Sequence, residues 1–166
     1  MDFRSRIVGY GDEPLDNILF NPNNWRVHPK AQQEAMTGVL SEIGWVEGVI
    51  INVKTGNLID GHMRALLAQK AGSKTIPAIY VDLTLDEENL ILATKDPIGM
   101  MAVADQQKFS DLCEVITTDN QAVEDLIKAM GEMDGIPEKS LDPKPGRTKK
   151  PKIVICPGCG MEIKPA

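Results

Sequence analysis

The sequence predicts an α+β domain with a small mixed sheet, a helical C-terminal cap, and a short β-hairpin after a linker. Strand-like apolar runs alternate with helix-like spacing as far as residue 83, and only helical patterns follow, to about residue 130. A run rich in proline and lysine then precedes a tail with apolar residues on both sides of a CxxC motif. The chain has 166 residues, of which 42% are apolar and 25% charged, an ordinary globular composition.

The first elements are a short strand, a loop and a helix. The apolar run 18–20 is a strand candidate that ends at an Asn-Pro pair, and a polar loop follows. Pro29 can open a helix, and apolar residues recur at helical spacing from Met36 to Ile43. Gly44 is placed to end this helix in the left-handed conformation.

A β-hairpin then leads directly into a second helix. Residues 49–53 are β-branched and apolar, and a Thr-Gly-Asn turn connects them to a second apolar run that ends at Asp60-Gly61. The helical pattern begins immediately afterwards and continues to Ala71.

A strand over residues 76–83 and an acidic helix come next. Thr84 and Glu87 have the spacing of a capping box, which predicts the start of this helix. We expect the helix to continue to about Lys95, because Pro97 interrupts the pattern.

Two amphipathic helices complete the pattern before the linker. Their apolar stripes cover residues 109–116 and 123–130. Cys113 lies on the first stripe, so we expect it to pack in the core as a small apolar residue.

The charge of the chain is unevenly distributed. Residues 1–137 carry 11 basic and 21 acidic side chains, whereas residues 138–166 carry seven basic and three acidic ones. The acidic part repels a phosphate backbone, which argues against tight, sequence-independent DNA binding by the main domain. No apolar run approaches the roughly 20 residues of a membrane span, and residues 1–12 lack the apolar core of a signal peptide. We therefore expect a soluble, cytoplasmic protein without membrane contacts.

The first candidate site is the strand-to-helix corner at Asp60-Gly61-His62-Met63-Arg64. The first turn of a helix has unpaired backbone N–H groups, and glycine lets an anion approach them closely. Arg64 can hold two phosphate oxygens, and His62 can donate or transfer a proton. Asp60 can orient a sugar hydroxyl or cap the helix. The alternative is a tight turn with a solvated arginine and a surface histidine.

The second candidate site is the loop over residues 21–29, which places Trp25, Arg26 and His28 just before a helix. An aromatic face, a guanidinium and an imidazole can stack on a base and pair with phosphates. The alternative is that Trp25 only anchors the loop on the core.

Six features occur together along the chain: NWRVHP at 24–29, a helix that ends at Gly44, a strand at Val49, DGHMR at 60–64, GSKTIP at 72–77 and a strand to Leu83. In this order and with this spacing, residues 14–105 resemble the N-terminal domain of the ParB/sulfiredoxin superfamily. The resemblance is strongest to ParB-like domains of phages and to those fused to DNA methyltransferases.

The resemblance implies a nucleotide ligand, CTP or ATP, together with Mg²⁺. The loop from strand to helix is the phosphate-binding box of this superfamily. By resemblance, Gly61, His62 and Arg64 contact the phosphates, and Arg26 and His28 face the same pocket.

Three departures from the superfamily limit the implied function. Sulfiredoxin chemistry needs a cysteine in the box, where this chain has His62 and no cysteine before Cys113. The Asn-and-Arg box of CTP-hydrolysing partition proteins is replaced by ATKDPI at 93–98, which puts metal-dependent hydrolysis in doubt. Between the ParB-like region and the linker the chain offers only two helices, so a helix-turn-helix centromere binder is not expected.

We divide the chain into four parts. The ParB/sulfiredoxin-like domain covers residues 14–105, and a helical extension covers 106–137. A basic, Pro- and Lys-rich linker at 138–152 has almost no apolar residue to bury. A zinc-knuckle-like tail covers 153–166.

The tail contains the motif CPGCG, with Cys156 and Cys159 as metal ligands. Zinc needs four ligands, and the chain has no second CxxC. We favour a four-cysteine zinc site shared across a homodimer. The alternatives are a metal-free remnant and completion by a partner protein, and Cys113, His28 or His62 are distant candidate ligands.

The sequence therefore predicts a ParB-like nucleotide-binding module, phage encoded, that acts with a DNA-modifying or DNA-handling protein in the bacterial host cell. We expect the partner protein, rather than this chain, to contact DNA directly. One alternative is a nucleoside triphosphatase, kinase or nuclease, in which His62 transfers a proton and Asp60 or Asp96 holds a metal. Another is an interaction or regulatory protein that binds no nucleotide and uses its acidic surface and zinc knuckle for docking.

Overall fold

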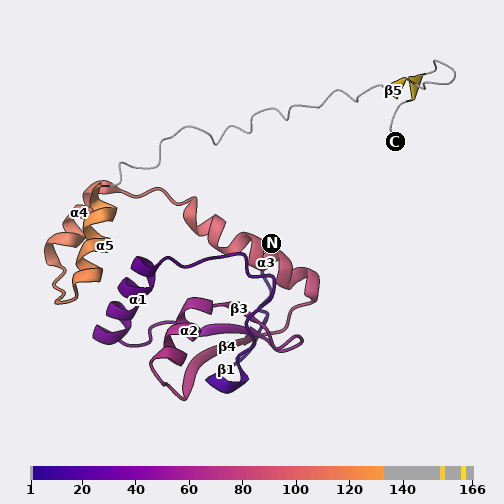
Figure 1. The fold of residues 1–166 in the computed structure, drawn as a ribbon, viewed down its shortest axis with the longest axis horizontal. Coiled ribbons are helices and arrows are strands. Elements are labelled where there is room, and N and C mark those ends of the chain that lie inside the picture. Colours follow the sequence, from indigo (N-terminus) through magenta and orange to yellow (C-terminus); the bar gives the residue numbers. More distant parts are fainter. Residues whose placement is uncertain (1, 133–153, 156–161, 164–166) are drawn as a thin grey trace. The chain divides into compact units, whose positions relative to one another are not determined.

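The computed structural model describes residues 2–132, 154–155 and 162–163. The chain divides into two compact units, Met1–Gly135 and Ile136–Ala166. In its described residues, the first unit has five α-helices and a four-stranded sheet, which confirms the predicted α+β class (Figure 1).

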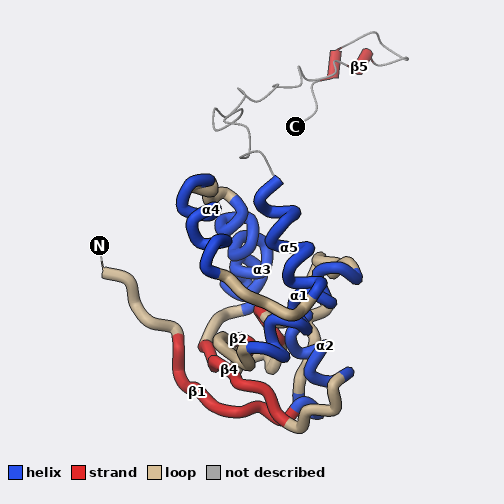
Figure 2. Tube along the Cα trace, turned by 90° about the vertical axis from the view of Figure 1, so that its left-hand side faces the viewer, coloured by secondary structure: helices blue, strands red, loops and turns tan. Residues whose placement is uncertain are grey.

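The sheet has the strand order β1-β4-β2-β3 and is mixed, as predicted. Its strands are β1 (Ile7–Pro14), β2 (Val49–Asn52), β3 (Leu58–Asp60) and β4 (Thr75–Val81). β4 pairs antiparallel with β1 and parallel with β2, and β2 forms the predicted antiparallel hairpin with β3. Figure 2 shows β1 along the outer edge of the sheet.

The core lies between the sheet and α2 (His62–Lys70). Ala65 and Ala68 are the buried small residues of this helix, and their short side chains let it approach the strands closely. The core cluster consists of Leu15, Ile18, Val49, Ile51, Leu58, Ala65, Ala68, Ile76 and Ala78.

Two further helices begin where the sequence predicts, the first against α2 and the second against β3. α1 (Lys30–Glu42) starts directly after Pro29, and Gly44 follows it with a φ of 87°. α3 (Leu85–Met100) opens with the predicted capping box, in which Thr84 accepts from the backbone N–H of Glu87 and the Glu87 side chain accepts from that of Thr84.

The last two described helices are α4 (Gln106–Val115) and α5 (Gln121–Glu132). α5 packs on α1, where Val123 is buried and Gly38 allows a close approach. A Cβ at position 38 would lie 2.6 Å from the side chain of Asn120. No helix in the described part of the chain is long and apolar enough to cross a membrane.

One strand is missed from the sequence and three local expectations are wrong. β1 is not predicted, because it is an exposed edge strand without an alternating apolar pattern. The run 18–20 forms only an isolated bridge, between Leu19 and Asn57. α3 continues through Pro97, so proline does not end the helix. Cys113 is only half-buried, because α4 has no fully buried residue.

In the second unit, β5 (Val154–Ile155) pairs antiparallel with β6 (Glu162–Ile163), as the expected hairpin requires. Cys156, Cys159 and the proposed linker at 138–152 lie outside the described residues. The zinc site and the division of the chain into four parts therefore stay predictions.

Candidate functional site

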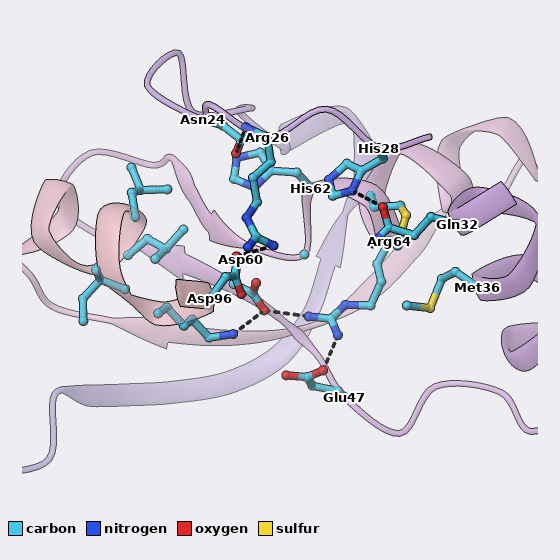
Figure 3. A pocket seen from close by; sticks show the side chains of 16 residues that line it. Asn24, Arg26, His28, Gln32, Met36, Glu47, Asp60, His62, Arg64 and Asp96 are labelled. Carbon is cyan, nitrogen blue, oxygen red and sulfur yellow. Dashed lines mark hydrogen bonds and ion pairs between the residues drawn. The ribbon is translucent and has the colours of Figure 1, made fainter. Parts of the chain in front are cut away.

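A pocket of about 230 Å³ lies at the start of α2 (Figure 3). Its other walls are the 21–29 loop, the first turns of α1, Glu47 and the middle of α3. The structure brings all six predicted nucleotide-binding residues to this pocket: Arg26, His28, Asp60, Gly61, His62 and Arg64. The two candidate sites in the sequence therefore meet in one pocket, although Trp25 of the second site is not a lining residue. Ligand binding by these residues stays a prediction.

Gly61 is the N-cap residue of α2 and has a φ of 89°. No side chain caps the helix there, and its first residues line the pocket, so the uncapped N–H groups and the positive end of the helix dipole lie beside it. A Cβ at position 61 would lie 2.6 Å from Cγ1 of Val49 on β2. Both the backbone conformation and the contact with β2 therefore require glycine, a reason that the sequence does not reveal.

Arg64 is held by two carboxylates. Its Nη2 donates to Asp60 Oδ2 at 2.8 Å, and its Nη1 pairs with the carboxylate of Glu47. The side chain is only 12% exposed, and its Nε has no hydrogen-bond partner among the described residues. The group predicted to hold phosphate thus already has anionic partners, one of which, Glu47, the sequence does not single out.

Arg26, from the 21–29 loop, is likewise paired with a carboxylate. Its Nη1 lies 2.7 Å from Asp96 Oδ2 on α3, and its guanidinium carbon lies 5.3 Å from the centre of the Trp25 ring. Trp25 is itself exposed, and its Nε1 donates to the carbonyl of Leu92 at 3.2 Å. Trp25 therefore anchors the loop on α3 and supports Arg26 by a cation–π contact.

Lys95 is a third cation in the pocket, 3.2 Å from Asp60 Oδ2. Nothing in the sequence distinguishes it from a solvated lysine on an acidic helix. With Arg26 and Arg64 it makes three basic side chains among the lining residues, against three carboxylates at Glu47, Asp60 and Asp96. The pocket lining therefore has a formal net charge of zero when the two histidines are neutral.

The two histidines make different contacts. His62 Nε2 accepts a hydrogen bond from the backbone N–H of Asn21 at 3.4 Å, and His28 Nδ1 lies 3.0 Å from Gln32 Oε1. Burial lowers the pKa of His62 from its usual 6.5, although the negative charge of Asp60 acts in the opposite direction. His62 is therefore a neutral imidazole at pH 7.

The carboxylates are placed for ion pairing. Asp60 contacts Arg64 and Lys95, and Asp96 contacts Arg26. The described residues contain no group of three or more His, Cys, Asp or Glu side chains that could hold a metal ion. The alternative enzyme mechanism, with a metal on Asp60 or Asp96, would first have to break these pairs.

No protein-family model and no curated protein matches the chain. Among solved structures, it is similar to a C-terminally truncated chromosome-partitioning protein ParB from Caulobacter crescentus, complexed with CTP-γ-S. The sequence identity is 21%, the TM-score is 0.47, and the match covers 53% of this chain and 52% of that chain. It is also similar to a Pnob8-like ParB-N domain, with 15% identity, a TM-score of 0.40, and coverage of 51% and 34%. This chain thus spans about half of the first structure and a third of the second.

Proposed function

We propose that the domain is a ParB-like nucleotide-binding module whose pocket at the start of α2 holds phosphate groups. The observation that carries this proposal is the convergence of three cations with one uncapped helix N-terminus. Arg26, Arg64 and Lys95 all line the pocket that the first turn of α2 borders. Backbone N–H groups at a helix start and guanidinium forks are the usual protein partners of phosphate oxygens.

The size of the pocket favours phosphates over a complete nucleotide. Its volume of about 230 Å³ is below the roughly 300–1,000 Å³ of sites that enclose a drug-sized ligand. The base and part of the sugar would then lie outside the pocket, and Trp25, an exposed neighbour of Arg26 that does not itself line the pocket, could offer them an aromatic face. CTP or ATP, with Mg²⁺, is the ligand class that the sequence resemblance implies.

Binding would proceed by exchange of ion-pair partners. Glu47, whose side chain is 52% exposed, loses the least when a phosphate replaces it on Arg64. Asp60 is 18% exposed and is shared by Arg64 and Lys95, so it is better placed to stay and keep both cations in position.

The test is titration calorimetry with CTP, ATP and their mono- and diphosphates, with and without Mg²⁺. Lys95→Ala should weaken binding, because it removes a pocket cation. Lys54→Ala is the matched control, because Lys54 is also a partly exposed lysine paired with an aspartate, Asp82, and it does not line the pocket. Absence of binding by the wild-type chain to every nucleotide would refute the proposal.

The wider role follows from charge and from the sequence resemblance. The acidic residues 1–137 argue against tight unaided DNA binding, so we place the module beside a DNA-modifying or DNA-handling partner. We further propose a soluble, cytoplasmic protein, phage encoded, that forms a homodimer through a zinc site at Cys156 and Cys159. Pull-down from the host with the full chain, followed by assay for a DNA-modifying enzyme, tests the partner.

A further inference from the structure

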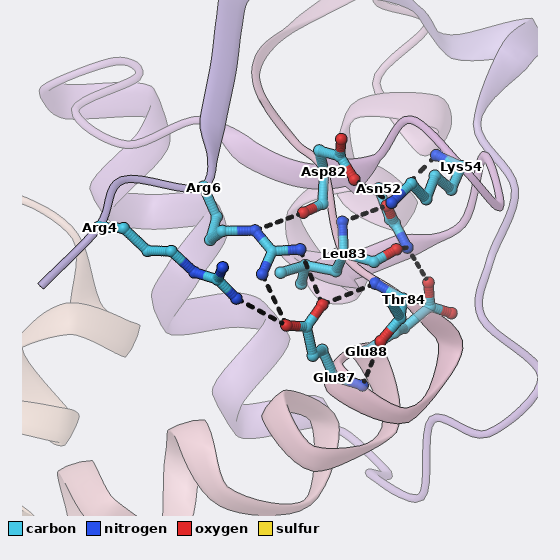
Figure 4. A network of polar contacts seen from close by, with 9 residues as sticks. All are labelled: Arg4, Arg6, Asn52, Lys54, Asp82, Leu83, Thr84, Glu87 and Glu88. Carbon is cyan, nitrogen blue, oxygen red and sulfur yellow. Dashed lines mark hydrogen bonds and ion pairs between the residues drawn. The ribbon is translucent and has the colours of Figure 1, made fainter.

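Glu88, in the first turns of α3, is a buried carboxylate without a cation. It is 1% exposed, and no Lys or Arg in the described part of the chain forms an ion pair with it. Four neutral side chains donate to it instead: Asn21 Nδ2 at 2.7 Å, Asn52 Nδ2 at 2.6 Å, Thr55 Oγ1 at 2.6 Å and Asn57 Nδ2 at 3.2 Å. Figure 4 shows its contact with Asn52.

This arrangement is demanding, because an unpaired charge is costly to bury. Burial by itself raises the pKa of Glu88, but the hydrogen bonds from Thr55, Asn52, Asn57 and Asn21 together lower it below the usual value. Glu88 is therefore ionised at neutral pH. All four donors must stay in place for the carboxylate to remain satisfied.

The donors come from separate parts of the fold. Asn52 ends β2, and Thr55 and Asn57 lie in the turn to β3. Asn21, which is 5% exposed, begins the 21–29 loop. Its backbone N–H is also the group that donates to His62 Nε2. One carboxylate thus connects the hairpin to the loop that forms a wall of the pocket.

The same loop contacts α3 at further points beyond Glu88. Asn23 Nδ2 donates to Asn89 Oδ1 at 3.1 Å, Trp25 donates to the Leu92 carbonyl, and Arg26 pairs with Asp96. These later contacts are partly or fully exposed, whereas the contact between Asn21 and Glu88 is buried. The buried contact is therefore the one that sets how the loop lies along the helix.

We propose that Glu88 is a positioning residue for the pocket: through Asn21 it fixes the loop that carries Arg26 and orients the His62 ring so that Nε2 accepts and Nδ1 bears the proton. A neutral imidazole that accepts at one nitrogen must carry its proton on the other. His62 then offers a donor, which suits a phosphate oxygen. The part of this inference that concerns ligand affinity rests on the proposed function, and the part that concerns the tautomer does not.

Two matched variants separate positioning from simple stability. Asn21 and Thr55 each donate one short hydrogen bond to Glu88, and each accepts a backbone N–H from the residue two positions later. Asn21→Ala and Thr55→Ala therefore remove the same kinds of contact. Both should lower the thermal midpoint, but only Asn21→Ala should alter the pocket.

The readouts are ¹⁵N chemical shifts of the His62 ring and nucleotide affinity, both measured well below the thermal midpoint. In the wild type we expect a neutral ring protonated at Nδ1. Asn21→Ala should shift the ring nitrogens towards the other tautomer and weaken binding about tenfold, which corresponds to about 1.4 kcal/mol. Thr55→Ala should leave the His62 shifts unchanged and the affinity within about twofold of the wild type.

Equal effects of the two variants on His62 would overturn the proposal, as would a wild-type ring protonated at Nε2. If the wild type binds no nucleotide, the proposed function fails, and the His62 shifts still decide the positioning role. Glu88→Gln adds a further check, because its amide can satisfy fewer of the four donors. Folded Glu88→Gln protein with wild-type His62 shifts would contradict the inference.

Discussion

Asp60, the last residue of β3, and Arg64, in the first turn of α2, are four residues apart, and the arginine Nη2 donates to the aspartate Oδ2 at 2.8 Å across the uncapped start of the helix. Asp60 Oδ2 also forms an ion pair with Lys95 Nζ at 3.2 Å, so one carboxylate holds two of the three pocket cations. Asp60 therefore holds Arg64 and Lys95 in position, but its negative charge also neutralises part of their positive charge. Any anionic ligand has to compete with side chains of the protein itself.

Replacing Arg64 should therefore affect both binding and stability. Arg64→Ala removes a charge-assisted contact and is expected to weaken nucleotide binding by about 1.5–3 kcal/mol, measured by calorimetry. From the sequence alone, Arg64→Ala is expected to leave the stability of the fold almost unchanged. Because Arg64 is mostly buried and contacts both Glu47 and Asp60, we now expect a further loss of about 1–2 kcal/mol in the free energy of unfolding. Unchanged binding would remove Arg64 from the site.

Glu47→Gln should strengthen nucleotide binding severalfold. The substitution removes the negative charge that competes for Arg64 and leaves Asp60 in place. Glu34→Gln is the control, since Glu34 is equally exposed, pairs with Lys30 and does not line the pocket. Weaker binding by Glu47→Gln would instead make Glu47 part of the ligand contact.

Gly61→Ala tests the close approach of α2 to β2. Gly72→Ala is its control, because Gly72 also has a positive φ, 73°, but has nothing within 4 Å of the added Cβ. Both variants place an alanine in a left-handed backbone conformation, which costs about 1–2 kcal/mol. Gly61→Ala should lose about 1–3 kcal/mol more in urea unfolding, because its Cβ meets Val49. Equal losses would mean that β2 moves aside freely. Gly61→Val, with a β-branched side chain, should in addition lose nucleotide binding.

The stability of the domain should depend on pH through Glu87. Hydrogen bonds from Arg6, at 2.6 and 2.7 Å, lower the pKa of Glu87 from 4.5 to about 2 (Figure 4). Because the folded-state pKa is the lower one, this contribution is present above pH 4.5 and is lost as the pH falls towards 2. Arg6→Gln should flatten the stability profile between these values in denaturant titrations. Arg4→Gln, at a side chain 79% exposed and 3.5 Å from Glu87, should change it little.

The tail should be separable from the first unit. A chain that ends at Lys139 should keep the thermal midpoint of the full chain, because the Pro- and Lys-rich run has little apolar area to dock. If two tails share one zinc, the full chain should contain about half a zinc per chain and sediment as a dimer. Both properties should disappear in the Cys156→Ser, Cys159→Ser variant. One zinc per monomer would point to ligands within the chain, and no zinc would leave the motif a remnant.

The sequence predicts the elements whose patterns are local. The hairpin, α2 and its glycine start, and the capping box of α3 all depend on residues within a few positions of one another. The pocket residues at Arg26 and Arg64 could also be named, because each belongs to a short motif. β1 could not, because an edge strand exposed on both faces has no apolar alternation and is defined only by its pairing with β4.

The residues that support the site could not be predicted from the sequence either. Glu88 resembles any glutamate in the first turns of an acidic helix, and only the fold brings Asn21, Asn52 and the hairpin turn to its carboxylate. Glu47 and Lys95 are likewise ordinary charged residues until the chain places them beside Arg64 and Asp60. Long-range pairing of charges carries no signal in a single sequence.

The position of β4 between β1 and β2 also has a consequence for the growing chain on the ribosome. β1 is synthesised before the hairpin and α2, yet its pairing partner among the described strands is β4, with Ile7 opposite Val81. The hairpin can close from local contacts, whereas β1 must wait until β4 has emerged. A nascent chain that pauses before Thr75 therefore leaves the backbone N–H and C=O groups of β1 without their strand partner until β4 is made.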